Sequence, residues 1–238
     1  MLDTRINAYF KDIMSAYTRI LMQGDWQHPL SQRVKTAFEA SVALSTLPAH
    51  INFIDGMSGK KYREFINKLV KATPDARYLE IGSWAGSTAC AAMFSNTLKL
   101  TCVDNWSEFG GPKDLFFKNI NNTKSSSIDF TFIEDDFRNI DYSTIGYFNI
   151  YLFDGPHEEK DQYEGVLIAQ PALDNEYVLI VDDFNWSKVR KGTVDALAYL
   201  QSQGHSVIST IEVRTTEDNS HPDISGKNSN WHNGYMIV

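Results

Sequence analysis

The feature that most constrains the fold is an alternation of short apolar strands and helices that starts at Arg77. This pattern is typical of a parallel sheet with helices on both faces, because each helix returns the chain to the starting edge of the sheet. A polar connection, residues 216–233, has no helical periodicity and favours an antiparallel pair of strands at one edge. We therefore expect an α/β fold with a doubly wound, seven-stranded, mostly parallel sheet and an antiparallel edge strand. The expected strands are 78–82, 99–103, 129–133, 148–153, 177–182, about 206–214 and 234–238.

The front part of the chain has a helical pattern instead. Apolar residues recur at three- and four-residue spacing from Leu2 to Leu21, which predicts a helix that ends near Gly24. A second helix is expected from about Ser31, and a third follows the glycine-containing loop of residues 51–61.

We interpret residues 1–76 as an N-terminal helical cap and lid region and residues 77–238 as a separate ligand-binding domain. The apolar stripes of the front helices permit a homodimer through these helices. They equally permit the helices to cover the sheet of their own chain.

Composition places the chain among globular proteins, since 238 residues with 42% hydrophobic content can bury a substantial core. The longest apolar stretches are of strand length, well below the roughly 20 residues of a membrane span, and no secretory pattern opens the chain. Cys90 and Cys102 lack CxxC spacing and are expected to be small core residues in a reducing compartment. We therefore expect a cytoplasmic protein without a membrane partner.

Charge is distributed unevenly along the chain. Residues 1–77 carry 11 Lys and Arg against 7 Asp and Glu, whereas the remainder carries 11 against 23. An acidic body disfavours contact with a phosphate backbone, so nucleic acid is not expected as a partner.

One turn indicates a ligand site. From Tyr78 to Thr88, an apolar strand is followed by Glu80, Gly82, Gly86 and then by hydroxyl side chains that open a helix. The glycines allow the backbone to pass close to a ligand, and the free N–H groups of the helix offer donors. The spacing lacks the middle glycine of a dinucleotide fingerprint, so a ligand without phosphates is favoured.

Acidic residues recur at or just after five successive strands. In a doubly wound sheet, ligands bind outside the carboxyl ends of the strands, where the strand order reverses. A single acid there can be a helix cap, but five in succession indicate a site. These residues are Glu80, Asp104, Asp136, Asp154 and the pair Asp182 and Asp183.

Several segments resemble motifs of the class I S-adenosylmethionine-dependent methyltransferases, a seven-stranded doubly wound family. The resemblance covers roughly residues 77–238 and identifies them as an S-adenosylmethionine-binding methyltransferase domain. The last two segments resemble the metal-assisted, small-molecule O-methyltransferase branch. The segments are YLEIGSWAGST (78–88), CVDNW (102–106), IEDDF (133–137), YLFDGPHEEKDQYEGV (151–166) and YVLIVDDFNW (177–186).

The resemblance assigns the methionine end of the cofactor to the glycine turn. Glu80 would orient the ammonium group, while Gly82 and Gly86 leave room for the methionine portion. Ser87 or backbone N–H groups at the helix start would bind the carboxylate. Ser83 and Trp84 complete this end of the site, although core packing explains Trp84 equally well.

The resemblance also assigns the nucleoside end. Asp104 would accept both ribose hydroxyls, with Asn105 and Trp106 beside it. Asp136 would accept from the adenine amino group, and Phe137 would pack against the ring.

Three carboxylates form the expected metal site, namely Asp154, Asp182 and Asp183. Their repulsion would be relieved by a divalent cation, and oxygen ligands favour Mg²⁺ or the substitutes Mn²⁺ and Ca²⁺. Asp154 is also expected to contact the cofactor and to take part in catalysis. In the alternative arrangement, Asp183 caps the next helix or faces solvent and only Asp182 faces the site.

His157 follows Asp154 by one short turn and is a candidate general base, since imidazole titrates near neutral pH. Alternatively, it hydrogen-bonds a carboxylate or a backbone group. Lys60, Lys61 and Arg63 can close over an anionic substrate, but exposed surface charge is favoured for them. Residues 231–233, an aromatic and two polar side chains before the last strand, can line a substrate pocket. A turn of the edge hairpin explains them equally well.

These observations predict transfer of a methyl group from S-adenosylmethionine to a small-molecule acceptor, at a hydroxyl oxygen positioned by a divalent metal. An acidic body suits a neutral or cationic acceptor, and a metal that chelates two oxygens suits a vicinal diol. The alternatives are an NAD(P)-dependent Rossmann oxidoreductase and a non-catalytic module that binds S-adenosylmethionine or S-adenosylhomocysteine. Methylation of nucleic acid is disfavoured, because the fourth strand ends in Asp-Gly-Pro-His rather than in an adenine-methylation motif.

Overall fold

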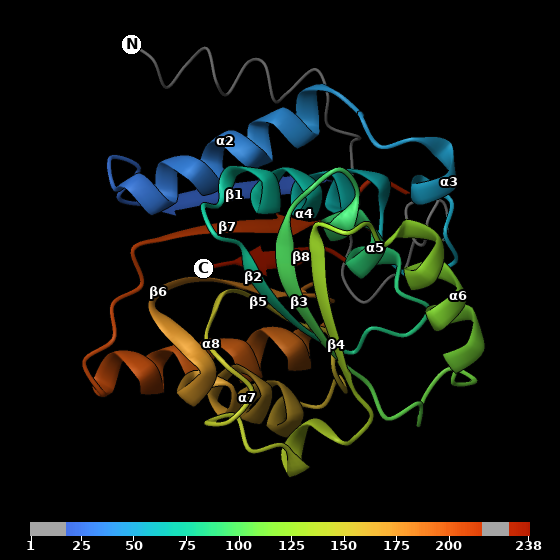
Figure 1. Ribbon diagram of the computed structural model, residues 1–238. Helices are drawn as coiled ribbons and strands as arrows, with labels where there is room; N and C mark the ends of the chain where they lie inside the picture. Colours follow the sequence, from blue (N-terminus) through green and yellow to red (C-terminus); the bar gives the residue numbers. More distant parts are fainter. Residues whose placement is uncertain (1–17, 216–228) are drawn as a thin grey trace.

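The computed structural model describes residues 18–215 and 229–238 (Figure 1). The part of the first expected helix that precedes Thr18 lies outside the described residues, as does most of the polar connection before the last strand.

An eight-stranded sheet with the order β1-β7-β8-β6-β5-β2-β3-β4 forms the centre of the molecule. Five neighbouring strands are parallel, and β1, β7 and β8 add antiparallel pairings on one side. The predicted α/β class and the mostly parallel, doubly wound sheet are therefore confirmed. The strands are β1 (Arg19–Gly24), β2 (Arg77–Ile81), β3 (Leu98–Val103), β4 (Ile128–Ile133), β5 (Phe148–Phe153), β6 (Leu173–Val181), β7 (Ser209–Arg214) and β8 (Tyr235–Ile237).

The strand order reverses between β2 and β5. The chain runs from β2 outward through β3 to β4, and then returns to place β5 against the other side of β2. The loops that follow β2 and β5 therefore diverge to opposite faces and leave a crevice at the carboxyl ends of the strands.

The number of strands and the identity of the edge strand differ from the prediction. Residues 19–24, expected at the end of a helix, form β1 and pair with β7 over six positions, from Arg19 opposite Arg214 to Gly24 opposite Ser209. Ile20 and Met22, which alternate along β1, pack against the core. A short apolar run fits a helix or a strand equally well, and here the distant edge of β7 decides the outcome. The predicted antiparallel pair, β7 and β8, is present, but β8 lies inside the sheet and β1 forms the edge.

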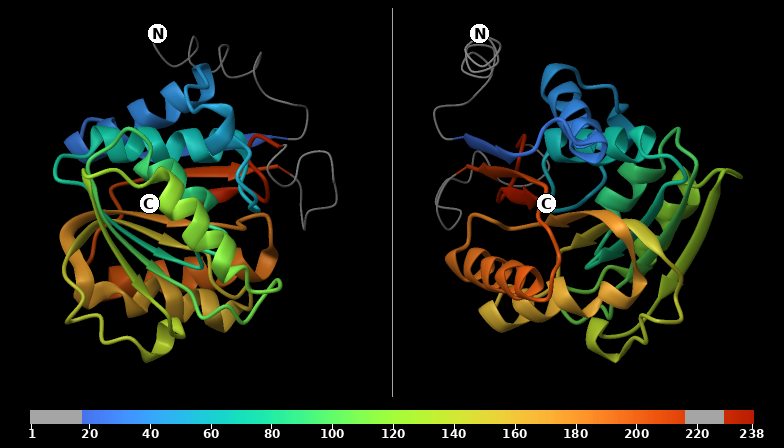
Figure 2. Two further views of the ribbon diagram at one scale, coloured as in Figure 1. Left: turned by 45° about the vertical axis from the view of Figure 1, so that its right-hand side comes forward. Right: turned by 90° about the vertical axis from the view of Figure 1, so that its left-hand side faces the viewer.

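Helices cover both faces of the sheet (Figure 2). Side chains of α2, α4, α5 and α6 pack into one apolar core, and those of α7 and α8 pack into the other. Successive residues of β2 separate these cores, since Tyr78 joins the first and Leu79 the second. The helices are α2 (Pro29–Ala43), α3 (Ala49–Asn52), α4 (Lys60–Ala72), α5 (Ser87–Met93), α6 (Lys113–Thr123), α7 (Glu159–Ile168) and α8 (Ser187–Ser202), with 3-10 turns η1 (Phe137–Asn139) and η2 (Gln170–Ala172).

The described front helices cover the sheet of their own chain. Phe38 of α2 is fully buried, contacting Phe65 of α4 edge-on and stacking on Trp231 at a ring-centroid distance of 5.6 Å. Of the two arrangements that the sequence permits, a homodimer through these helices or coverage of the chain's own sheet, this packing is the second.

Cys90 and Cys102 are buried and free, as expected of core residues, and burial raises the pKa of both thiols. No helix within residues 18–215 and 229–238 is long and apolar enough to cross a membrane.

Candidate active site

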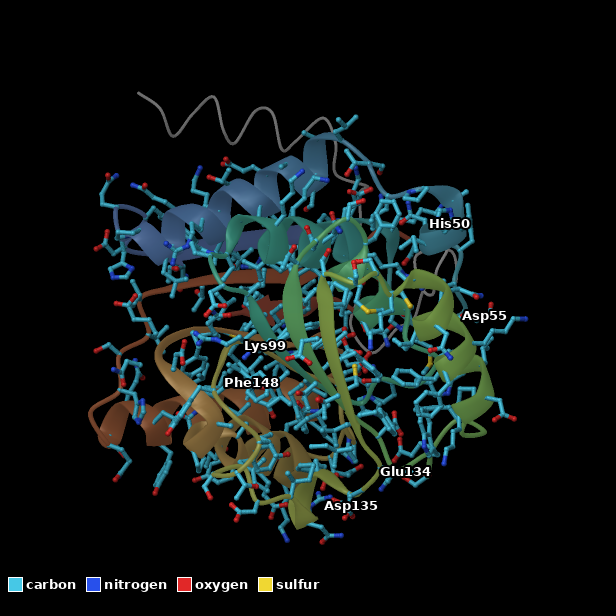
Figure 3. The ribbon with its side chains drawn as sticks, viewed as in Figure 1. His50, Asp55, Lys99, Glu134, Asp135 and Phe148 are labelled. Carbon is cyan, nitrogen blue, oxygen red and sulfur yellow. The ribbon has the colours of Figure 1, made fainter. Side chains whose placement is uncertain are left out.

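A cavity of about 410 Å³ opens at the carboxyl ends of the parallel strands. Its walls come from the loops after β2, β3, β4, β5 and β6 and from the segment before β8. Asp135 lies in the loop at the end of β4, next to Glu134, whereas Phe148 lies at the start of β5 (Figure 3). Of the predicted site residues, those that line this cavity are Gly82, Trp84, Asp104, Asn105, Asp136, Phe137, Asp154, His157 and Asp183.

The glycine turn after β2 requires glycine at both positions. Gly82 has a φ of +85°, and a Cβ atom there would lie 1.8 Å from the backbone oxygen of Asp154. Gly86 has a φ of +80°, and its Cβ would lie 3.0 Å from the ring of Phe116. Gly82 therefore allows the ends of β2 and β5 to meet, and this contact closes the floor of the cavity.

Glu80 lies beneath this turn rather than in the cavity wall. It is fully buried, and its carboxylate accepts a hydrogen bond of 2.7 Å from the Tyr78 hydroxyl. Burial raises its pKa to about 7, although the Tyr78 hydrogen bond acts in the opposite direction. Ser83 is buried as well, and the Ser87 hydroxyl contacts the Ser58 hydroxyl at 2.8 Å.

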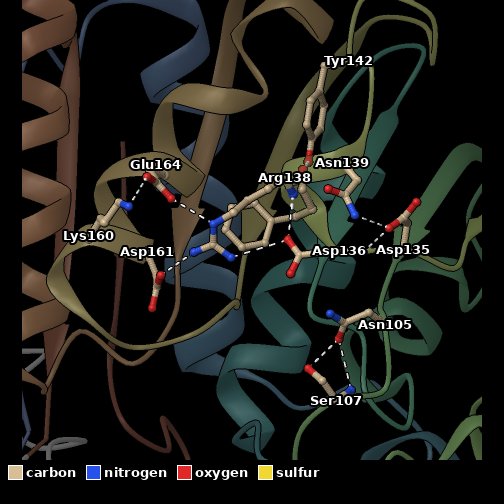
Figure 4. A network of polar contacts seen from close by, with 11 residues as sticks. Asn105, Ser107, Asp135, Asp136, Arg138, Asn139, Tyr142, Lys160, Asp161 and Glu164 are labelled. Carbon is tan, nitrogen blue, oxygen red and sulfur yellow. Dashed lines mark hydrogen bonds and ion pairs between the residues drawn. The ribbon is translucent and has the colours of Figure 1, made fainter.

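Asp104, at the end of β3, connects two loops that border the cavity. Its Oδ2 accepts from the backbone N–H of Trp84 at 2.8 Å, and its Oδ1 accepts from that of Trp106 at 2.7 Å. Trp106 itself packs away from the cavity and stacks on Phe132. Asn105 accepts hydrogen bonds from Ser107 on the exposed side of the same loop (Figure 4).

Asp136 and Phe137 follow β4 and form the next part of the wall. Asp136 caps η1 by accepting from the backbone N–H of Arg138 at 2.9 Å. The Arg138 guanidinium lies 4.2 Å from the centre of the Phe137 ring and pairs with Asp161 and Glu164 of α7 (Figure 4). Arg138 thus links Asp136 and Phe137 to α7.

Three potential ligands converge on the opposite wall. Side-chain donor atoms of Asp154, His157 and Asp183 all lie within 4.8 Å of one another. Nε2 of His157 is 2.5 Å from Oδ2 of Asp183, and the Asn233 amide donates to the other oxygen of Asp183. Asp182 lies outside this group, with its carboxylate accepting from the backbone N–H of Asp183 at 2.7 Å.

Asp183 is held in the site by its backbone as well as by its contacts. It adopts a positive φ of +55° and is 8% exposed, so it faces the cavity rather than solvent. The arrangement in which only Asp182 faces the site is therefore not the one observed.

The wall that contains Asp154, His157 and Asp183, called the acidic wall below, holds groups with shifted pKa values. The hydrogen bond with Asp183 raises the pKa of His157 to about 9, so the imidazole is protonated at neutral pH. Burial and the neighbouring charges of Asp182 and Asp183 raise the pKa of Asp154 well above its usual range. As a cation paired with Asp183, His157 donates a proton rather than accepting one. His157 therefore makes the hydrogen bond to a carboxylate that the alternative interpretation predicted, in place of the role of a general base.

Aromatic and sulfur-containing side chains at the cavity mouth were not predicted. Met57, Phe109 and Trp186 line the cavity and are exposed by 40%, 58% and 38%. Trp186 stacks on the imidazole of His157 at a ring-centroid distance of 5.8 Å. The available signals were an apolar residue beside glycines, as at Met57 and Phe109, and the tryptophan that ends the YVLIVDDFNW segment.

Part of the segment before β8, residues 231–233, lines the cavity, as one of the two interpretations of these residues predicted. His232 and Asn233 line the cavity, whereas Trp231 packs on the core of α2. Burial lowers the pKa of His232 to about 4, so its imidazole is neutral at physiological pH.

The interpretation of Arg63 as exposed surface charge is wrong. Its side chain is fully buried in α4, and its guanidinium donates to backbone carbonyls of the preceding loop. Lys61, two residues earlier, donates to the Val42 carbonyl at 2.8 Å, and Lys60 lies over the ring of Phe53. Local sequence could not reveal this burial, because it depends on a loop that wraps around the helix start.

Comparison with known proteins supports the resemblance to methyltransferases. Residues 79–184 match a family model described as "Methyltransferase domain". This segment extends from β2 to the loop after β6 and so includes the glycine turn and the acidic wall. No curated protein matches the sequence.

Among solved structures, an O-methyltransferase from Bacillus cereus in complex with SAH aligns with a TM-score of 0.51 at 13% identity, covering 100% of this chain and 98% of that one. The O-methyltransferase TomG from Streptomyces achromogenes gives 0.49 at 12% identity, covering 98% and 94%. TrmN from Thermus thermophilus gives 0.49 at 14% identity over 88% of this chain, which spans only 53% of that longer chain.

The Bacillus cereus structure shows that the fold of this chain is that of a Rossmann-like methyltransferase. Together with the family match, it confirms the expected resemblance to class I S-adenosylmethionine-dependent methyltransferases.

Proposed function

We propose that the protein transfers the methyl group of S-adenosylmethionine to a hydroxyl oxygen of a small molecule. One observation carries this proposal: a single cavity joins the glycine turn and the nucleoside-end residues to the wall formed by Asp154, His157 and Asp183. Such a cavity can hold a cofactor and an acceptor side by side, as in-line displacement requires.

We place the cofactor along the loops after β2, β3 and β4. The methionine portion would lie at Gly82, the ribose at Asp104, and the adenine between Asp136 and Phe137. The missing middle glycine of the turn and the match to a methyltransferase model favour this cofactor over NAD(P).

A divalent cation fits the opposite wall. Asp154 and Asp183 supply carboxylate oxygens, which suit Mg²⁺ or Mn²⁺, whereas the ring nitrogen of His157 is a softer ligand that suits transition metals better. When bound, the cation would orient acceptor oxygens and lower the pKa of the acceptor hydroxyl. His157 can join this set only after it releases the proton that it shares with Asp183. We assign Asp182 to support of Asp183 through the backbone N–H contact.

The cavity wall favours an uncharged or cationic aromatic acceptor. Within the described part of the chain, no lysine or arginine lines the cavity, whereas Asp135, Glu108 and the acidic wall do. Trp186 and Phe109 at the mouth offer flat apolar surfaces on which an aromatic ring can stack.

In the reaction, the acceptor oxygen forms a bond to the methyl carbon while the carbon–sulfur bond of the sulfonium breaks. The hydroxyl proton passes to water, because His157 is already protonated at neutral pH, and S-adenosylhomocysteine remains. Among the described front residues, Met57 lines the cavity, and we assign to the loop that carries it the role of a cap over the cofactor side of the site.

Isothermal titration calorimetry with S-adenosylhomocysteine and with NAD, each with Mg²⁺ and with a chelator, tests the proposal. We expect binding of S-adenosylhomocysteine and none of NAD. The reverse result would refute the proposed class of activity. Binding without methylation across a screen of phenols and catechols would instead identify a non-catalytic module, and activity insensitive to chelation would remove the cation from the proposal.

A further inference from the structure

A buried arginine lies behind the glycine turn, outside the residues assigned to the reaction. Arg63 is fully buried, and each acceptor of its hydrogen bonds within the described residues is a neutral oxygen. Nε donates to the Ser58 hydroxyl at 2.9 Å, and the two terminal nitrogens donate to backbone carbonyls. These carbonyls belong to Ile51, Asn52, Ile54 and Gly56, at 3.3, 2.9, 2.8 and 3.4 Å.

These contacts stabilise the guanidinium without cancelling its charge. Carbonyl dipoles replace part of the lost hydration, but a buried cation is fully compensated only by an anion. Burial lowers the pKa of Arg63 to about 10, so it stays cationic at neutral pH, and Asp55 acts on it through space. The guanidinium therefore keeps its charge at neutral pH and lies against the backbone of residues 51–58.

This loop is joined directly to the glycine turn. The Ser58 hydroxyl, which accepts from Arg63, contacts the Ser87 hydroxyl at 2.8 Å. A Cβ on Gly56 would lie 2.2 Å from the Ser87 oxygen, so the loop backbone rests against this serine. Met57, between the two contacts, lines the cavity. The cation and the turn are thus connected by one chain of hydrogen bonds.

We propose that Arg63 is a positioning residue for the carboxylate end of the cofactor. It holds the loop of residues 51–58 against Ser87, and its positive charge favours a ligand that carries a carboxylate at this end over one that lacks it. This inference rests on the proposed function, because it assumes that the cofactor's methionine portion lies at the glycine turn.

The test compares two ligands that share the nucleoside and sulfur. S-Adenosylhomocysteine carries the amino-acid portion, and 5′-methylthioadenosine lacks it. For Arg63→Met we expect the affinity for S-adenosylhomocysteine to fall by about tenfold or more, which corresponds to roughly 1.4 kcal/mol. Binding of 5′-methylthioadenosine should change by less than about twofold, because its contacts lie at the other end of the cavity. Arg63→Lys, which keeps the charge, should recover part of the loss.

Lys61→Met is the matched control, since Lys61 lies in the same helix and its ammonium group donates to the Val42 carbonyl. This variant should leave the affinity ratio of the two ligands unchanged. Ser58→Ala provides a second route should Arg63→Met fail to fold, because it removes the link between Arg63 and Ser87 while leaving the cation in place. We expect it to lower the same ratio by about threefold or more.

The inference is overturned if the wild type binds S-adenosylhomocysteine and the ratio is unchanged in whichever of Arg63→Met and Ser58→Ala fold. An equal loss for both ligands would also overturn it, since that indicates a general structural role. If the wild type binds neither ligand, the proposed function fails instead, so the two failures are distinguishable.

Discussion

Two groups of buried charges flank the cavity, and the protein stabilises them differently. Behind the glycine turn, the single cation of Arg63 is surrounded by neutral oxygens of one continuous loop. On the opposite wall, Asp183 contacts the His157 imidazole and the Asn233 amide, and Asp154 and Asp182 lie beside it as two further acids. The first group is one cation hydrogen-bonded to neutral oxygens, with Asp55 acting through space, and the second is three acids beside one imidazole.

This difference indicates which ligand charge each side can receive. The Arg63 loop is fixed by backbone contacts, and under the inference above it favours a carboxylate at the glycine turn. The acidic wall can accept a cation, but its histidine must first give up a proton. The comparison therefore predicts a ligand whose negative end and positive or metal-bound end lie on opposite sides of the glycine turn.

Replacing Asp183 should give the largest effect, because Asp183 holds both His157 and Asn233. Asn tolerates the positive φ of this position, so Asp183→Asn should fold. We expect kcat to fall by about 10²-fold or more, as is typical when a charged group of an active site is lost. Initial rates with a phenolic acceptor, together with calorimetry of S-adenosylhomocysteine, give the measurement, and cofactor affinity should stay within about twofold of the wild type.

Asp195→Asn is the control for this prediction, since Asp195 is an exposed residue of α8 that pairs with Lys191. A comparable loss of activity in both variants would show that the effect does not come from the acidic wall.

Glu80→Gln tests whether the buried acid beneath the glycine turn, like the acids of the acidic wall, lowers the stability of the protein when it is ionised. The pKa of Glu80 is about 7 in the folded protein, above its usual value near 4.5. Between these values the folded state holds a proton that the unfolded state has released, so the free energy of unfolding falls as pH rises through this window. Above pH 7 the full penalty applies, up to about 3 kcal/mol for a shift of this size.

Removal of the charge should therefore stabilise the cofactor-free protein at pH 8 and leave its stability at pH 4 nearly unchanged. Urea unfolding of the wild type and Glu80→Gln at both pH values measures this difference. Equal stability of the two proteins at pH 8 would contradict the assignment of a buried, ionised Glu80.

Arg138→Ala should have the smallest effect, because the ion pairs of Arg138 with α7 are partly exposed. We expect a stability loss of at most about 1 kcal/mol, as is usual for exposed pairs. The affinity for S-adenosylhomocysteine should weaken by about twofold to threefold, since the ring of Phe137 loses the cation that packs on it. Thermal unfolding and calorimetry at low and high salt measure both effects. A tenfold loss would place Arg138 among the direct ligand contacts.

The parallel strands were predictable because their apolar runs are buried on both faces and are bounded by turns. The run of β5, FNIYLF, leaves few alternatives to a central strand. The sequence of β1, RILMQG, contains too few residues to distinguish two periodicities, and its partner lies far along the chain. Its conformation therefore depends on tertiary pairing that local patterns do not encode.

The same distinction applies to the site. Asp154 and Asp183 were predictable because strand ends in a parallel sheet meet at one edge, and their acidic side chains have no role in a core. His157 was recognised as a candidate, but its ion pair depends on the backbone conformation of Asp183, which no motif specifies. Arg63 was misassigned because basic residues are usually exposed, and its buried environment is formed by a loop that precedes it in the chain.

The pairing of β1 with β7 also affects the order in which the chain can fold during synthesis. β1 leaves the ribosome among the first described segments, yet its sheet partner is residues 209–214, and that partner reaches the rest of the sheet through β8 at residues 235–237. The five parallel strands can pair earlier, because all of them precede residue 182. The front strand must therefore wait through most of translation, and pairings of such long sequence separation form slowly because loop closure costs entropy.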